Sequence, residues 1–268
     1  MASVHGLQLV EERGWRQGLA NLLRQENAQW WRTRRWWVQS LFWLALINGS
    51  LGVLLWIAPI LYPDTPVALA KKLELFTRAL GWWPMFAVIT ITQGSIIAEK
   101  QSGTAAWILS GPVSRAAFIL SKLIGNAIGF LVTVILLQGP IAYVQLSLSD
   151  ANLLPVLPFV IALSIHSLYL LFYLTLTLML GTFFDTREPV LGVALTIAVI
   201  SLMDLGRSLG SLVSWAPLLT PEMLPNLAAT AIQGEVLAPD WLVSIMAMLV
   251  YAVSFVALAI WRFNREEL

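Results

Sequence analysis

Long apolar runs separated by short polar segments set the pattern of this chain. Crossing the roughly 30 Å hydrocarbon core of a bilayer takes about 20 helical residues, and six runs come close to that length or exceed it. The pattern predicts an all-α integral membrane protein, a single transmembrane domain over residues 1–268 with six membrane spans. The predicted spans are residues 36–60, 82–98, 122–148, 153–184, 189–205 and 241–261.

The composition supports this reading. Hydrophobic residues make up 58% of the chain and charged residues only 12%, whereas soluble domains carry about 25% charged residues. The chain has no cysteine, which excludes disulfides, thiolate metal sites and cysteine nucleophiles. Several of the 13 tryptophans lie beside the ends of the apolar runs, where indole rings mark the membrane–water interface.

The basic residues are distributed unevenly over the predicted loops. With a cytosolic N-terminus, twelve of the 16 Lys and Arg residues fall in inside segments. Only Lys71, Lys72, Arg78 and Arg207 fall outside. This positive-inside bias predicts a multi-pass protein of the cell (plasma or inner) membrane with both termini in the cytosol.

The N-terminal arm, residues 1–35, contains a predicted amphipathic helix over residues 13–35. At 100° per residue one arc of about 100° collects Trp15, Leu19, Leu22, Leu23 and Trp30, an arrangement suited to the plane of the membrane interface. Glu26 falls inside the same arc. Either its side chain snorkels out or pairs with a nearby arginine, or it contacts another subunit.

Two outer segments are too polar or too broken to be spans. Residues 61–81 predict a loop followed by a short helix. Residues 206–240 predict short apolar helices interrupted by prolines. Such helices either re-enter the membrane, where protein must shield them, or form a simple outer cap.

The segment 99–115, between the second and third spans, has a distinctive order of signals. A helix ends at Glu99 and Lys100, Ser102-Gly103 breaks the chain, and a short apolar helix is predicted over residues 104–109. A Ser-Gly-Pro turn follows, and a new helix starts near Ser114. A short rigid helix in this place can transmit a push from a cytosolic partner into two spans at once.

This segment resembles the membrane subunits of ATP-binding-cassette exporters of the type-2 permease family. The resemblance is carried by Glu99-Lys100-Gln101-Ser102-Gly103-Thr104, by Gly111-Pro112-Val113-Ser114-Arg115 and by Lys122. It extends to Gln25-Glu26, to Arg32–Arg35 before the first span, to the six-span layout and to the short basic tail. Trp107 departs from the leucines usual in the family.

The resemblance implies that residues 99–115 form the coupling helix that docks onto an ATPase subunit. The implied coupling residues are Glu99, Lys100, Gln101, Ser102, Gly103, Thr104, Trp107 and Arg115, and those of the interfacial helix are Glu26, Arg32, Arg34 and Arg35. The implied assembly pairs this permease with a second copy or a paralogous permease and with two ATPase subunits.

The ATPase is expected on a separate chain. No Gly-Lys dipeptide occurs, so no G-x-x-x-x-G-K-[ST] phosphate loop exists in the sequence. We therefore expect a non-catalytic subunit that carries no catalytic residue, metal or cofactor of its own and binds no nucleic acid. ATP and Mg²⁺ would belong to the partner.

Polar residues within the spans admit two interpretations. Thr90, Gln93, Asp204 and Arg207 are candidates for a pathway or a gate, but interhelical hydrogen bonds, or an Asp204–Arg207 pair at the outer boundary, explain them equally well. His166 has no acid or cysteine at ligand spacing, which favours a hydrogen-bonded helix contact. The small residues Gly125-x-x-x-Gly129 predict close helix packing.

Two other function classes compete with an ATP-driven exporter. An intramembrane hydrolase would need a G-x-S-G or H-E-x-x-H signature, and neither occurs. A secondary transporter or channel would need paired ionisable groups within its spans, and the second, third, fourth and sixth spans are essentially uncharged. The cargo (lipid, peptide, antibiotic or ion) stays open, and export as the direction follows from the resemblance alone.

Overall fold

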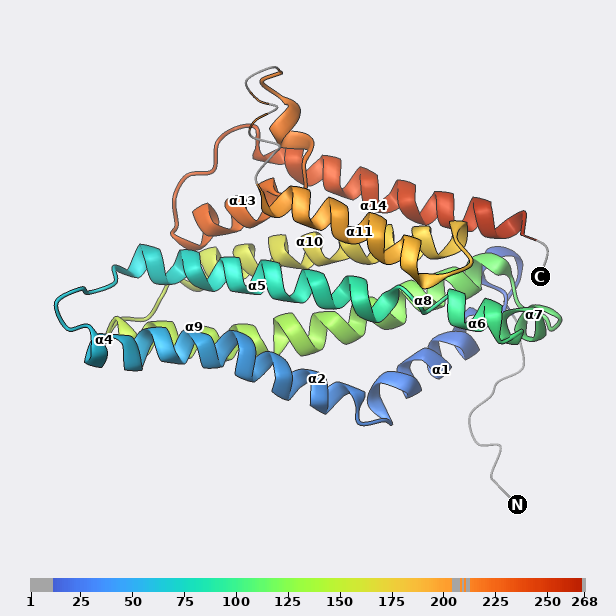
Figure 1. Ribbon diagram of the computed structural model, residues 1–268, viewed down its shortest axis with the longest axis horizontal. Coiled ribbons are helices and arrows are strands. Elements are labelled where there is room, and N and C mark those ends of the chain that lie inside the picture. Colours follow the sequence, from blue (N-terminus) through green and yellow to red (C-terminus); the bar gives the residue numbers. More distant parts are fainter. Residues whose placement is uncertain (1–11, 204–207, 209, 211–212, 267–268) are drawn as a thin grey trace.

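The computed structural model describes residues 12–203, 208, 210 and 213–266, and within these residues every regular element is helical. The helices form an elongated bundle with their axes roughly along its long dimension (Figure 1). One end of the bundle, here called the α7 end, carries α1 (Leu19–Trp31), α6 (Ile97–Gln101), α7 (Thr104–Leu109) and the end of α14 (Trp241–Asn264). The opposite end is called the α4 end, after α4 (Ala58–Leu61).

Five helices in the described part of the chain are long and apolar enough to cross a membrane. They run Arg35–Leu61, Leu69–Gln101, Arg115–Ser149, Val156–Phe183 and Trp241–Asn264. The all-α prediction is therefore confirmed, with about five candidate spans. The run predicted as a fifth of six spans, 189–205, corresponds to α11 (Arg187–Leu202), whose 16 residues are fewer than those of the other spans.

The helix of the second candidate span begins before residue 82. The helix α5 covers Leu69–Thr92, so the short outer helix expected within 61–81 is continuous with the helix of that span. Lys71 and Arg78 pair with Glu74 at spacings of three and four residues, and these contacts stabilise the polar first turns of the helix. Pro84 is accommodated inside the helix.

The first and third spans are each interrupted by π-helical turns. The first span consists of α2 (Arg35–Trp43), η2 (Leu44–Gly49), α3 (Ser50–Gly52), η3 (Val53–Ile57) and α4, and η2 and η3 are π-helical. The third span consists of α8 (Arg115–Phe130), the π-helical η4 (Leu131–Leu136) and α9 (Gln138–Ser149).

An amide cluster joins the two spans beside these turns. Asn48 Nδ2 donates to Gln138 Oε1 at 2.9 Å, and Gln145 Nε2 donates to Asn48 Oδ1 at 3.2 Å. Gln138 Nε2 also donates to the Thr133 carbonyl in η4 at 3.0 Å. The wide π-helical turns leave backbone carbonyls free to accept hydrogen bonds from side chains. The buried side-chain amides also satisfy one another.

The core of the bundle lies around α10 (Val156–Phe183), which packs against α5, α13 (Met223–Ile232) and α14. His166 on α10 lies 2.8 Å from the Thr77 carbonyl on α5 through Nε2 and 2.9 Å from the Ala162 carbonyl through Nδ1. These are the helix contacts that the sequence favours for this histidine. The first span and α14 expose most of their apolar surface.

The described residues of the segment 206–240 include the 3₁₀ turn η5 (Ala216–Leu219) and the apolar helix α13. Leu224, Leu227 and Ala228 of α13 are buried against the bundle. Asp204 and Arg207 lie outside the described residues.

In the described part of the N-terminal arm, a 3₁₀ turn, η1 (Gly14–Arg16), precedes α1. The helix therefore starts at Leu19 rather than at residue 13, and Trp15 is exposed and does not belong to its apolar face. That face, with Leu22, Glu26 and Trp30, packs against α8 and is covered by protein.

Candidate functional site

The link between α6 and α7 is a tight glycine turn at the α7 end of the bundle. Gly103 has φ 72°, a left-handed conformation that suits glycine, and it precedes the first residue of α7. The Ser102 and Thr104 hydroxyl groups lie 2.8 Å apart across the turn. The predicted break and the predicted short helix are both present, and α7 runs Thr104–Leu109 as expected.

One face of α7 is buried and the other carries a bare indole ring. Ala105 is fully buried, whereas Trp107 is 78% exposed. The Trp107 carbonyl accepts a hydrogen bond from the Ser110 hydroxyl at 2.7 Å, which closes the helix into the following turn. Among the tryptophans that the structure describes, Trp107 is the most exposed.

Ser114 joins the start of α8 to the N-terminal arm. Its Oγ accepts from the Ala117 amide at 3.0 Å, which caps α8, and donates to the Trp15 carbonyl at 2.6 Å. Its own amide donates to the Gln17 carbonyl at 3.0 Å. Ser114, at the predicted helix start, therefore also holds the N-terminal arm in place.

Arg115 holds the end of α14. Its Nη1 donates to the carbonyls of Phe263, Asn264 and Glu266 at 2.7, 3.0 and 2.7 Å. These carbonyls lie at a helix C-terminus, where a cation is stabilised by the helix dipole as well as by hydrogen bonds. The segment 99–115 is thereby attached to the last candidate span.

Lys100 connects α6 to two further segments. Its Nζ lies 3.0 Å from Asp185 Oδ1, in the loop between α10 and α11, and 2.5 Å from Glu266 Oε1 in the C-terminal tail. Gln101 Nε2 donates to the Asp185 carbonyl at 2.8 Å. The Lys100 side chain is only 8% exposed, although that of Asp185 is 85% exposed.

Lys122 forms the most buried ionic contact at this end. Its Nζ pairs with Glu26 Oε1 at 2.6 Å and with Glu99 Oε1, and the Lys122 and Glu26 side chains are 5% and 9% exposed. Glu26 therefore pairs with a lysine of α8, 96 residues away, rather than with an arginine of its own arm. Sequence spacing holds no signal for that partnership.

The three arginines predicted for the interfacial helix differ in their exposure and contacts. Arg32 and Arg34 are exposed, so the structure does not bring them into the ionic contacts of Lys100 or Lys122. The Arg35 guanidinium lies over the Trp30 ring, 4.1 Å from its centroid.

Two of the predicted pathway residues, Thr90 and Gln93, line a polar cavity of about 320 Å³ at the α7 end. Their side chains bond locally, since Thr90 donates to the Phe86 carbonyl and Gln93 donates to the Thr90 carbonyl. The remaining lining comes from α1, α2, α6, α8 and α11 and from the turn before α6, and includes Glu26, Gln29, Arg35, Ser95, Glu99, Lys122, Asn126 and Arg187.

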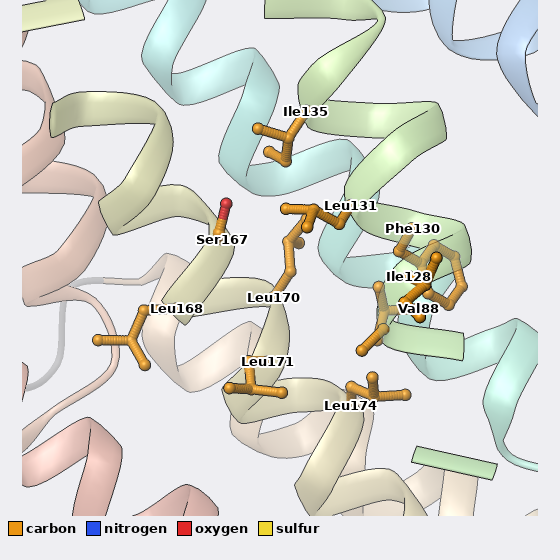
Figure 2. A pocket seen from close by; sticks show the side chains of 11 residues that line it. Val88, Ile128, Phe130, Leu131, Ile135, Ser167, Leu168, Leu170, Leu171 and Leu174 are labelled. Carbon is orange, nitrogen blue, oxygen red and sulfur yellow. The ribbon is translucent and has the colours of Figure 1, made fainter. Parts of the chain in front are cut away.

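A second cavity, of about 340 Å³, lies between α5, α8, η4 and α10 and is almost wholly apolar. Its walls are Val88 of α5, residues of α8 and η4 such as Leu131, and residues of α10 such as Leu171, with Ser167 the polar exception (Figure 2). None of the predicted site residues lines this cavity. Sequence reasoning did not single it out, because its residues carry no signal beyond hydrophobicity.

The described residues include no group of three or more His, Asp or Glu side chains that could hold a metal ion.

Two comparisons with known proteins bear on this chain. The model of a family described as "Protein of unknown function (DUF2705)" matches residues 52–268. The chain is also 28% identical over 189 residues to the "Uncharacterized transmembrane protein YxlG" of Bacillus subtilis (strain 168), a match that covers 68% of each chain. With the five long apolar helices, this similarity shows a multi-pass membrane protein.

Proposed function

This chain belongs to the DUF2705 family, and we propose that it is the membrane-spanning subunit of an ATP-driven ABC exporter. In this proposal two permease subunits form the translocation pathway, and each couples to a separate ATPase subunit that binds ATP and Mg²⁺. The chain itself is not an enzyme.

The observation that carries the proposal is the anchoring of the α6–α7 segment. α7 presents Trp107 to the outside, while the residues on either side of it are held by charge. Lys100 and Glu99 precede α7, and Arg115 follows it. These contacts reach the arm, the α10–α11 loop, α8 and the end of α14.

This arrangement suits a mechanical link. A force applied to Trp107 would act on a helix whose two ends are tied to several spans, so that the spans move together rather than α7 alone. A helix attached only at one point would swing without moving the bundle. The buried ion pairs make the connection stiff, because separating them would leave charges in a poorly hydrated site.

The orientation of the chain is part of the proposal. The positive-inside bias favours the α7 end in the cytosol with both termini, where an ATPase would be found. Six crossings require that α11, helical over Arg187–Leu202, completes a fifth span. With the α7 end inside, α1 lies at the cytosolic interface. The short helix α13, between the last two spans, lies at the outer side.

The test is the capture of partners by wild-type and variant chains. Tagged protein extracted in mild detergent should bring down, in stoichiometric amount, a protein with a phosphate loop. Trp107→Ala should reduce that recovery at least several-fold. Trp15→Ala changes another exposed tryptophan of the same end, 59% exposed, and should leave recovery unchanged. A wild-type chain that brings down no ATPase even after mild chemical cross-linking would show the proposal to be wrong.

A secondary transporter is the second candidate, because one observation favours it. The Lys122 contact with Glu26 and Glu99 borders the polar cavity, and ionisable groups in such a place are typical of ion-coupled carriers. The argument from uncharged spans is weaker than the sequence indicates, since the helices that form the second and third spans include Glu99 and Lys122. Transport by reconstituted vesicles that needs a proton gradient and no ATPase would favour this candidate.

A further inference from the structure

Two guanidinium groups line the polar cavity, each with an acidic residue in its surroundings, Glu26 for Arg35 and Glu188 for Arg187, but with no carboxylate in direct contact among the described residues. Arg35 comes from α2 and Arg187 from α11, and both line the cavity. Neither forms a salt bridge with a carboxylate in the described part of the chain. Guanidinium groups bind phosphate strongly, because their planar donors match its oxygens.

A glycine makes room for one of these groups. A Cβ built on Gly94 would lie 3.0 Å from Arg187 Nε and 3.1 Å from Arg187 Cζ. The guanidinium therefore rests directly against the backbone of the turn before α6. Gly94 does not have a positive φ. Its lack of a side chain therefore makes room for the guanidinium and is not needed for the backbone conformation.

The same cavity wall has acceptors that lack donors. Glu99 Oε2 and Gln93 Oε1 are buried and have no hydrogen-bond partner, and both residues line the cavity. Buried acceptors without a partner are costly and uncommon. A ligand with N–H donors would satisfy them, and a cationic one would also be attracted by the carboxylates of Glu26 and Glu99.

The level of the cavity points to a lipid. Arg35 is the first residue of the first span, and Trp36 and Trp37, which follow it, are 39% and 41% exposed. Exposed tryptophans at the end of a span mark the headgroup region of the bilayer. A cavity of about 320 Å³ at that level is accessible to a headgroup whose acyl chains stay in the membrane.

We propose that this cavity binds the headgroup of an aminophospholipid, with its phosphate on Arg35 and Arg187 and its ammonium group toward Glu99 and Gln93. The shared chemistry is a phosphate and a primary ammonium a few bonds apart. The inference does not rest on the exporter function, since a carrier or a channel could hold the same lipid.

The test compares lipids that differ only in the ammonium group. Wild-type protein is reconstituted into nanodiscs with equal amounts of phosphatidylethanolamine and phosphatidylcholine, extracted in mild detergent, and its retained lipid is measured by mass spectrometry. We expect at least five-fold enrichment of phosphatidylethanolamine, because the choline group has no N–H donor. Equal retention of the two lipids would overturn the proposal.

Matched variants place the site. Arg187→Gln removes the charge, and Gly94→Ala displaces the guanidinium without removing it, so both should abolish most of the enrichment. Arg34→Gln removes an exposed neighbour of Arg35 that does not line the cavity, and should retain it. Enrichment that survives both Arg187→Gln and Gly94→Ala in folded protein would overturn the proposal.

A further experiment with a soluble headgroup analogue tests whether the cavity binds the lipid or the free headgroup. O-phosphoethanolamine at millimolar concentration should raise the thermal stability of the detergent-solubilised protein less than phosphatidylethanolamine does. Protection by the soluble compound equal to that by the lipid would overturn the assignment to a lipid.

Discussion

Two lysines at the α7 end, Lys122 and Lys100, use the same chemistry in opposite surroundings. Each amino group contacts two acidic side chains from distant parts of the chain. Glu26 and Glu99 surround Lys122 and are 9% and 17% exposed, so protein encloses the group except toward the polar cavity. Lys100 pairs with Glu266, 10% exposed, on one side and with Asp185, 85% exposed, on the other.

The difference separates a fixed contact from one that can open. The polar cavity is the route by which water can approach Lys122 and its partners, whereas water and salt reach Asp185 freely. Lys122 therefore holds α1, α6 and α8 together more firmly than Lys100 holds the loop between α10 and α11. The Lys100–Asp185 contact lies at the loop between α10 and α11 and can break and re-form at small cost.

The largest effect is expected for Lys122→Met. Removing the lysine leaves Glu26 and Glu99 without a cation in an enclosed site, which costs about 3–5 kcal/mol. We expect the melting temperature of the detergent-solubilised protein to fall on the order of 10 °C. Changing Glu26→Gln and Glu99→Gln together with Lys122→Met should recover most of that loss. A single variant as stable as the wild type would contradict the enclosed character of the site.

Arg115→Ala should have an intermediate effect, because Arg115 donates to three carbonyls at the end of α14. Hydrogen bonds to a charged group contribute about 1.5–3 kcal/mol. The expected result is faster hydrogen exchange of the backbone amides over residues 260–266. Arg265→Ala is the control and should change the exchange less. This substitution removes a guanidinium that lies over the Trp261 ring.

Asp185→Asn should have the smallest effect. Its carboxylate is exposed, and pairs of that kind contribute about 0–1 kcal/mol. We expect a melting temperature within about 2 °C of the wild type, and 0.5 M NaCl should remove even that difference. A loss of stability comparable to that of Lys122→Met would show that the two lysines are not different in kind.

The sequence predicted the membrane character of the fold well, because hydrophobicity alone defines the spans. It did not predict that the helix of the second span begins at Leu69. Lys71, Glu74 and Arg78 make the first turns of α5 polar, and hydropathy does not detect the local ion pairs that support them. It also assigned Trp15 to a helix that begins only after Gly18, which has φ 78°.

The candidate site was predictable in its backbone and not in its contacts. Gly103, Ser114 and the short helix between them follow from local signals. The partners of Lys100, Arg115 and Lys122 lie far along the chain, and no periodicity encodes them. Close packing at Gly125 and Gly129 was predicted, but the identity of α1 as the packing partner was not. A Cβ built on Gly125 would lie 2.7 Å from Glu26 Cβ, and one built on Gly129 would lie 2.3 Å from the Trp30 ring.

The π-helical turns of the first and third spans affect how the chain can be edited. A π turn contains one residue more than the α-helix around it requires. Deleting one residue from η4, such as the exposed Leu136, would restore regular helix and leave the flanking side chains on their original faces. The same deletion within α10 would rotate every later residue of that helix by about 100°. Single-residue length changes are therefore best tolerated at these turns.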